Sequence, residues 1–175
     1  MKFYPTTTMP FKRRREGKTD YKARLALLKS EMPMLVVRKS LNRVTAQIVE
    51  YDKVGDKTRA TAISPELKKF GWNYDMKNLP SSYLLGLLIG KKALKLGIKE
   101  VVLNSGLHNL TKGNKIYAVL KGALDAGLKI PHSAEILPSE DRIKGMHISS
   151  HDKKFSKLPS DFENVKKKIL ESSKI

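Results

Sequence analysis

The sequence predicts a mixed α/β domain in which helices pack against a mixed sheet. Three short segments between positions 34 and 63, one continuously apolar and two alternating, predict an antiparallel three-strand meander. Two longer apolar segments, near 82–96 and 114–126, predict helices, and a short strand is predicted between them. Helices that alternate with strands after a meander indicate a mixed sheet with helices against it.

The first 24 residues are strongly basic, with eight Lys or Arg against two Asp or Glu. The first ten residues contain Pro5 and Pro10 and show no periodicity, so we expect an extended arm. The run from Arg13 to Arg15 has no matching run of acids nearby. A lysine run is usually only a solvated face, whereas this arginine run favours a binding segment.

A short amphipathic helix is predicted to follow the arm. Thr19 can cap its N-terminus, and an acid in the first turn suits the helix dipole. Leu25, Leu28 and Met32 then repeat at helical spacing. Pro33 ends the segment because proline cannot continue a helix.

The three strands of the meander follow. Residues 34–38 form a valine-rich apolar run that predicts a buried strand. Residues 40–43 predict a tight turn, and the alternation over 44–48 predicts a half-buried strand. A second turn at 52–57 leads into the third strand at 58–63.

The first long helix is predicted to begin after Ser81 or Ser82, either of which can cap it, and to continue to about Leu96. Its first half is apolar on all sides, so we expect it to be buried. Gly86 and Gly90 are expected to allow close packing of this helix onto the sheet.

The remaining elements are shorter. Residues 101–103 predict a buried strand, and residues 114–126 predict a second helix with one apolar stripe. Residues 159–161 are typical of a helix start near the C-terminal end. The apolar residues of that last helix share one face: Phe162, Val165 and Ile169.

Composition narrows the class of protein. The chain has 175 residues, a formal net charge of +18 and no cysteine, so no disulfide framework is expected. The longest uncharged stretch has 13 residues, too few for a membrane span, and no secretory signal is expected at the N-terminus. The excess positive charge predicts a polyanionic partner, and the basic arm lacks the apolar helical face that a membrane surface requires.

Several kinds of chemistry are not expected. His147 and His151 are four residues apart, but a zinc site needs two further ligands. Asn114 at a predicted helix start could hold a phosphate with the amides around it or simply cap the helix. Trp72 and Tyr74 could stack on bases or cover the edge of the core. A metal-dependent nuclease would need clustered carboxylates, and nothing brings together the four candidates, Asp52, Asp56, Glu100 and Asp125.

Five motifs in order carry a resemblance to a known family. They are RRREGKTDY at residues 13–21, VVRKS with Asn42 and AQI at 36–48, SYLLGLL with two lysines at 82–92, GNK with LKGALD and GLKIPHS at 113–133, and RIKG with His147 and Ile148 at 142–148. Together they resemble the archaeal and eukaryotic 5S-rRNA-binding protein of the large ribosomal subunit, equivalent to bacterial ribosomal protein L18. The length is similar to that of the archaeal members.

The resemblance implies a structural protein rather than an enzyme, without cofactor, metal or small-molecule substrate. It would be cytoplasmic, within the large ribosomal subunit, and would bind 5S rRNA and anchor it to large-subunit rRNA in the central protuberance, beside a second 5S-binding protein. The implied fold is a three-layer mixed-sheet domain of ribonuclease-H-like topology. We expect a basic arm at 1–18 that folds on binding RNA, a globular domain at 19–150 and a basic helical extension at 151–175.

The expected RNA contacts come from four segments. The arm would neutralise phosphates, and the first hairpin would read RNA shape through phosphates and 2′-hydroxyls. The alternative is a basic nucleic-acid-packaging protein without specificity, which would bind duplex DNA equally well. The expected RNA-binding residues are Lys12, Arg13, Arg14, Arg15, Lys18, Tyr21, Lys22, Arg24, Arg38, Ser40, Asn42, Arg43, Lys112, Asn114 and Lys115.

Overall fold

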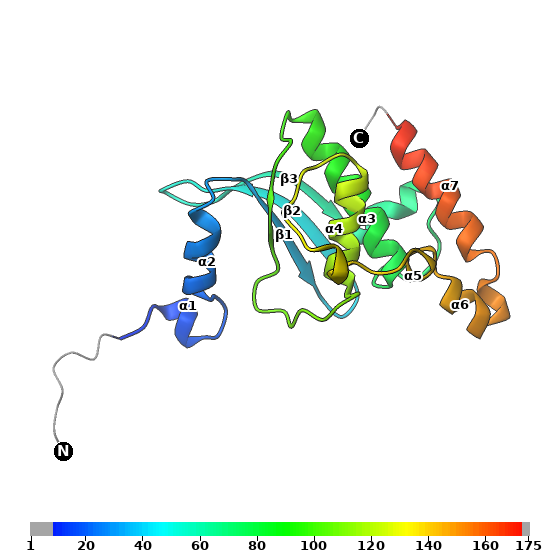
Figure 1. The fold of residues 1–175 in the computed structure, drawn as a ribbon, viewed down its shortest axis with the longest axis horizontal. Helices are drawn as coiled ribbons and strands as arrows, with labels where there is room; N and C mark the ends of the chain where they lie inside the picture. The colour runs from blue at the N-terminus through cyan, green and yellow to red at the C-terminus, as the bar shows by residue number, and fades with distance from the viewer. Residues whose placement is uncertain (1–8, 173–175) are drawn as a thin grey trace, which may run out of the picture.

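The computed structural model describes residues 9–172, so the first eight of the ten residues expected to be extended lie outside them. This part of the chain contains four strands and seven α-helices (Figure 1). The strands are β1 (Met34–Lys39), β2 (Val44–Glu50), β3 (Lys57–Ile63) and β4 (Val102–Asn104). The α-helices are α1 (Lys12–Arg15), α2 (Tyr21–Leu28), α3 (Leu79–Lys95), α4 (Lys115–Asp125), α5 (Glu140–Lys144), α6 (Met146–His151) and α7 (Leu158–Glu171). Three 3₁₀ helices are η1 (Ser64–Phe70), η2 (Ala134–Ile136) and η3 (Lys153–Phe155).

The four strands form one mixed sheet in the order β3-β2-β1-β4. β1 pairs antiparallel with β2, β2 pairs antiparallel with β3, and β4 adds parallel to β1. The predicted meander and mixed sheet are therefore confirmed. The last strand begins one residue later than predicted, at Val102, whose amide bonds to the carbonyl of Pro33.

Helices α3 and α4 cover one face of the sheet, with the side chains of Leu35, Val37, Ala46 and Ile48 buried beneath them. On the other face, Thr58 and Thr61 of β3 are exposed. A third layer therefore does not cover this edge of the sheet. The ribonuclease-H-like topology stays a prediction.

Helix α3 begins earlier than predicted. Its N-cap is Asn78, whose side-chain oxygen accepts a hydrogen bond from the Ser81 amide at 2.8 Å. Ser81 and Ser82 lie inside the first turn, and both hydroxyls donate to the carbonyl of Asn78. The prediction that one of the serines caps the helix is wrong, because the side chain of Asn78 accepts the capping hydrogen bond from the Ser81 amide.

The close packing expected of Gly86 and Gly90 exists, but its partner is α4 and not the sheet. A β carbon on Gly90 would lie 2.5 Å from the β carbon of Ala126. A β carbon on Gly86 would overlap the backbone of Val119. The two glycines therefore let α3 and α4 cross at close range.

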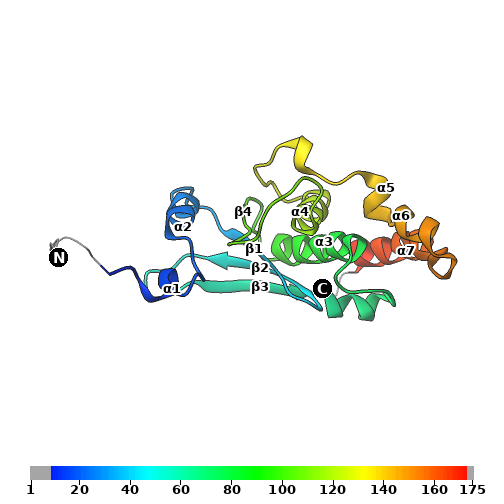
Figure 2. The ribbon, with the colours of Figure 1, turned by 90° about the horizontal axis from the view of Figure 1, so that it is seen from below.

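Helix α7 packs into the core. Its residues Phe162, Val165 and Ile169 are at most 2% exposed, as the shared apolar face predicts. The ring of Phe162 lies 5.5 Å from that of Tyr83 on α3. Figures 1 and 2 show α7 beside α3, at the end of the molecule away from α1 and α2. The C-terminal helix therefore completes the main body.

The segment that follows η1 is anchored in the core. Trp72 is fully buried and its ring nitrogen donates to the carbonyl of Asp75, so this residue belongs to the core and not to a stacking surface. The Tyr74 hydroxyl donates to the Asp161 carboxylate at 2.6 Å, which links the same segment to α7.

Within residues 9–172, no helix has the length and apolar character needed to cross a bilayer.

Candidate nucleic-acid interface

Helix α1 places four cations on one exposed turn, Lys12 to Arg15. An extended segment was expected there, but the amides of Arg14 and Arg15 both donate to the carbonyl of Phe11 and close the turn. The ring of Phe11 lies 5.1 Å from that of Tyr21 and braces α1 against the start of α2. The helical turn concentrates the four charges on a short segment of backbone.

The cations of this segment differ in whether they bind other groups of the chain. Arg13 Nε donates to the hydroxyl of Thr19 at 2.9 Å, which fixes the direction of its guanidinium. Lys18 pairs with Glu16 at 2.9 Å. Arg14 and Arg15 are exposed and make no ion pair within the described residues. These two arginines therefore remain available to an external anion.

Asp20 caps helix α2, because its carboxylate accepts from the amides of Lys22 and Ala23 at 2.9 and 3.1 Å. The prediction that Thr19 is the cap is wrong, since that hydroxyl is occupied by the Arg13 guanidinium. A carboxylate also suits the positive end of the helix dipole. The sequence contained this signal, because aspartate is as good a cap as threonine or better.

Helix α2 is not the amphipathic core helix that its leucine spacing predicts. None of its residues is buried, and Leu25 is 57% exposed. The helix ends at Leu28, four residues before Met32. Figures 1 and 2 show α1 and α2 standing away from the main body.

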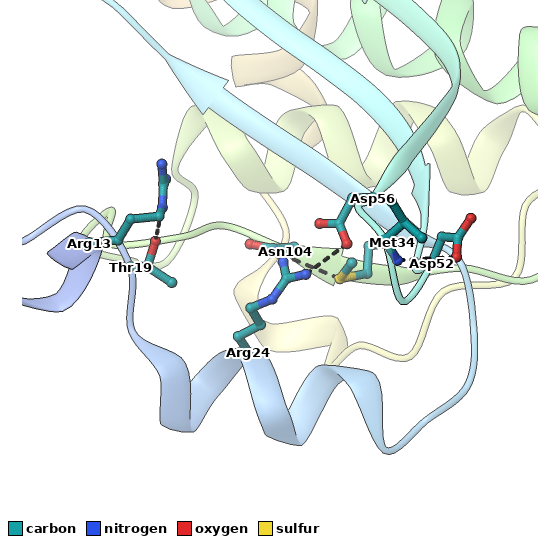
Figure 3. Close-up of polar contacts among 8 residues, drawn as sticks. Arg13, Thr19, Arg24, Met34, Asp52, Asp56 and Asn104 are labelled. Carbon is teal, nitrogen blue, oxygen red and sulfur yellow. Dashed lines mark hydrogen bonds and ion pairs between the residues drawn. The ribbon is translucent and has the colours of Figure 1, made fainter. Parts of the chain in front are cut away.

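An ion pair links α2 to the main body. Arg24 Nη2 lies 2.7 Å from Asp56 Oδ1 in the β2–β3 hairpin, and this hydrogen bond raises the pKa of Arg24 (Figure 3). Both side chains are about one-third exposed, so the pair contributes only modestly to stability. Its geometric effect is to set the distance between α2 and the hairpin.

A groove of about 850 Å³ lies between α2, the β2–β3 hairpin and the ends of β1 and β4. We name it the α1–α2 groove. Its acids are all engaged: Asp20 caps α2, Asp52 pairs with Lys57, and Asp56 pairs with Arg24. The groove is therefore cationic in balance. The cations that line it are Arg13, Lys18, Arg24, Arg38 and Lys53.

The guanidinium of Arg38 is held at the floor of this groove. Nη1 donates to the carbonyls of Val37 and Asn104 at 2.8 Å, and Nη2 donates to Asn104 Oδ1 at 3.1 Å. Desolvation lowers the pKa of Arg38. A β carbon on Gly106, where φ is +64°, would lie 2.9 Å from Arg38 Cζ. The glycine therefore lets the guanidinium lie flat against the loop backbone.

The turn after β1 lies apart from Arg38. Its hydrogen bonds run from the Ser40 amide to the Arg43 carbonyl at 2.8 Å and from the Arg43 amide to Ser40 Oγ at 3.2 Å. Ser40, Asn42 and Arg43 are exposed, and Asn42 lines a different groove from Arg38. Arg38 and Asn42 therefore line different grooves, and their joint contact with RNA stays a prediction.

The segment before α4 also lies outside the α1–α2 groove. Asn114 accepts from the Ile116 amide at 3.4 Å and donates to the carbonyl of Asn109, so it caps the helix. Lys112 forms an exposed pair with Glu135 at 3.3 Å. Lys115 is half-buried at the first position of α4. Capping therefore accounts for Asn114 without a phosphate.

The groove also contains residues that the sequence did not single out. Lys53 lies in a segment for which the sequence predicted a turn but no role in binding. Asn104 lines the groove because β4 pairs with β1. The same groove includes Tyr51 and Ser105. In the sequence, only the excess of positive charge pointed to Lys53 as a binding residue. Nothing in the sequence pointed to Tyr51, Asn104 or Ser105.

The carboxylates weighed for nuclease chemistry do not converge. Each lies 2.5–3.2 Å from a cation of the chain. Within residues 9–172, no three His, Cys, Asp or Glu residues are arranged to hold a metal ion. The four pairs are Asp52–Lys57, Asp56–Arg24, Glu100–Lys129 and Asp125–Lys121.

The sequence matches a known family over most of its length. The model of a family described as ribosomal large subunit proteins 60S L5 and 50S L18 matches residues 7–101 and 96–133. This range includes α1, α2, the whole sheet, α3 and α4, and thus every element that forms the α1–α2 groove.

Proposed function

Because this chain belongs to the family of the ribosomal large subunit proteins 60S L5 and 50S L18, we propose that it binds 5S rRNA and anchors it to large-subunit rRNA in the central protuberance. The family makes the protein a structural, non-catalytic component of the large ribosomal subunit in the cytoplasm. A second 5S-binding ribosomal protein is the proposed neighbour, and the archaeal branch is the proposed source. No membrane or small-molecule substrate takes part.

The α1–α2 groove is the observation that supports RNA binding. Its acids are already bound within the chain, whereas Lys53 of its lining forms no ion pair within the described residues, nor do Arg14 and Arg15, which lie on α1 next to the lining residue Arg13. An RNA backbone entering this space would meet cations with no competing carboxylate. Each phosphate contact would release a counterion and increase the affinity at low salt.

The groove also offers groups for recognising RNA shape. Asn104 and Tyr51 line it together with the oriented guanidinium of Arg38. Amide and hydroxyl groups bond to 2′-hydroxyls and phosphates, which distinguish RNA from DNA. The proposed contacts are therefore led by Lys12 to Lys18, Tyr21, Lys22, Arg24 and Arg38. The turn residues Ser40, Asn42 and Arg43, together with Lys112, Asn114 and Lys115, form outlying contacts.

We further propose a division of the chain by role. Residues 1–18 form the basic RNA-binding segment, and residues 19–150 form the globular body. The helix within 151–175 closes that body, since its apolar face lies in the core.

The test compares 5S rRNA with duplex DNA of similar length, measured by fluorescence anisotropy over a range of salt. The groove variant carries Lys53→Glu in the groove lining and Arg14→Glu and Arg15→Glu on the adjoining helix α1. The matched control carries Lys153→Glu, Lys154→Glu and Lys157→Glu, three exposed lysines at the far end of the molecule. We expect the groove variant to lose about tenfold or more in affinity for 5S rRNA at low salt, and the control to lose much less.

Two outcomes would contradict the proposal. Equal affinity of the unmodified chain for duplex DNA and 5S rRNA would support a packaging protein without specificity. Equal losses in the groove variant and its control would mean that total charge, and not the groove, determines binding.

A further inference from the structure

A second group of cations lies where η1, α3 and α7 meet. Lys68 and Lys69 are in the last turn of η1, and Lys168 is in the last turn of α7. A β carbon on Gly71, just after η1, would lie 3.5 Å from Lys168 Nζ, which places these two helix ends together. Lys91 of α3 donates to the carbonyl of Leu170 at 3.0 Å and joins the same corner. We name Lys68, Lys69, Lys91 and Lys168 the η1–α7 surface.

The cations of this surface outnumber the free acids around it. Glu66 on η1 pairs with Lys92, and Glu163 on α7 pairs with Lys144. Glu171 follows the lysines on α7 but forms no ion pair with any described residue. Lysines gathered in this way repel one another, and a polyanion removes that cost.

A groove of about 570 Å³ adjoins the η1–α7 surface. Lys68 belongs to both, Lys77 adds a further cation to the groove, and Asp75 adds one acid. Asn42 and Asn73 supply side-chain amides there. Lysines and side-chain amides are groups that bind phosphates and riboses of an RNA helix. An acidic peptide would use the lysines but would leave the amides without a specific role.

The two cationic surfaces lie at different ends of the molecule. Figures 1 and 2 show α1 and α2 at one end and α7 at the other, with the sheet and α3 between them. Occupation of one surface therefore leaves the other open. We propose that the η1–α7 surface binds large-subunit rRNA while the α1–α2 groove holds 5S rRNA. The inference rests on the proposed function and adds the face that meets the second RNA.

The experiment measures bridging between two RNAs. Biotinylated 5S rRNA is immobilised and saturated with the full-length chain, and the excess is washed away. Fluorescent large-subunit rRNA is then added with excess tRNA as competitor, and the retained signal is measured over a range of salt. The test variant carries Lys68→Glu, Lys69→Glu and Lys168→Glu. The control is the same Lys153, Lys154 and Lys157 triple charge reversal, which changes the net charge equally.

We expect the test variant to bind immobilised 5S rRNA within about twofold of the parent and to retain about tenfold less large-subunit rRNA. The slope of log retention against log salt should flatten by about 2 to 3, since three phosphate contacts contribute about 0.7–0.9 each. The control should retain large-subunit rRNA within about twofold of the parent. Thermal melting checks that each variant is folded, and Lys68→Gln, Lys69→Gln and Lys168→Gln replace the reversals if one is not.

Other outcomes overturn the inference in distinguishable ways. If the parent does not bind 5S rRNA, the proposed function itself fails. If the parent binds 5S rRNA but retains no large-subunit rRNA, only the inference fails. Equal retention by parent and test variant, or equal losses in test and control, also rejects the η1–α7 surface. A loss of 5S affinity in the test variant would assign this surface to 5S rRNA.

Discussion

Gly122 and Gly86 meet at the point where α4 crosses α3. A β carbon on Gly122 would lie 3.1 Å from the α carbon of Gly86 and 2.9 Å from the amide nitrogen of Leu87. It would also overlap the carbonyl oxygen of Tyr83. Because each position excludes a methyl group, the two helix backbones are in direct contact. This crossing sets the position of both helices against the sheet.

Gly86→Ala and Gly122→Ala should each destabilise the protein by about 2 kcal/mol or more, because the added methyl group forces the backbones apart. The free energy of unfolding is measured by urea denaturation. The control is Gly55→Ala in the β2–β3 hairpin, where a β carbon would meet no atom within 4 Å. Stabilities equal to that of the control would show that the crossing adapts to the methyl group.

Arg38 and Arg43 should behave differently when each is replaced by Ala. Arg38→Ala removes three hydrogen bonds, two of them to Asn104, and should lower the melting temperature and loosen the loop around Gly106. Arg43→Ala should change stability by about 0.5 kcal/mol or less, since the side chain is exposed. Differential scanning fluorimetry and 5S rRNA titrations separate the two roles. If the Arg38→Ala and Arg43→Ala variants melt at the same temperature, Arg38 has no structural role.

Deletion of residues 1–18 should flatten the salt dependence of 5S rRNA binding. If four to six of its cations meet phosphates, the slope should fall by about 3 to 5. The main body should remain folded, because Asp20 still caps α2 and α1 contributes no buried residue. An unchanged slope, measured by titration at several salt concentrations, would remove this segment from the RNA site.

Replacement of Arg13 to Arg15 by Lys tests geometry at constant charge. Lysine cannot reproduce the Nε donor that Arg13 offers to Thr19, nor the planar fork of a guanidinium. We expect a loss of about 1 kcal/mol or more in binding free energy at fixed salt, with little change in slope. Binding equal to the parent at every salt concentration would show that the segment acts only as a polycation.

Acidification should release the loop that follows β4. His108 Nε2 accepts a hydrogen bond from the Lys39 amide at 3.3 Å, so this nitrogen must be unprotonated. Burial first, and then the charges of Lys39 and Arg38, lower the pKa of His108 below 6.5. A lowered pKa in the folded state means that the unfolded state binds the proton more readily. This contribution to stability is present above the unfolded pKa and is lost as the pH falls through the folded pKa.

Amide hydrogen exchange at Lys39, corrected for intrinsic rates, should therefore accelerate as the pH falls below about 6.5. His108→Gln provides the control, because a neutral amide has no titration in this pH range. The same acceleration in parent and variant would mean that another group controls the loop.

The sequence predicted the sheet well because one face of it is buried. Alternating side chains such as Val44, Ala46 and Ile48 report that burial directly. The start of α3 was harder to place, since Asn78, Ser81 and Ser82 can all cap a helix. Pro80 held the missing signal, because proline is favoured in a first turn and indicates a start before it.

Contacts between distant residues could not be predicted in the same way. The pleat of β1 places Arg38 on the side opposite the buried Val37, but Asn104 is 66 residues away and reaches it only through the parallel pairing of β4. The helical spacing of Leu25 and Leu28 predicted an amphipathic helix, yet no residue of α2 is buried. The glycines of α3 indicated a close approach, while the identity of the partner helix depends on tertiary packing.

The position of α7 in the core has a consequence for the order in which the molecule is made. Translation proceeds from the N-terminus, so the cations of α1 and α2 leave the ribosome before any strand exists, and α7 leaves last. Until Phe162 is synthesised, the ring of Tyr83 lacks its aromatic partner and the side of α3 that α7 covers is exposed. A nascent chain therefore presents its polycationic segment while its body is incomplete, and the core closes only when synthesis ends. A chain that ends before residue 158 would keep the cations of α1 and α2 but would lack α7, so part of its core would stay exposed. We expect such a chain to be a substrate for chaperones and proteases.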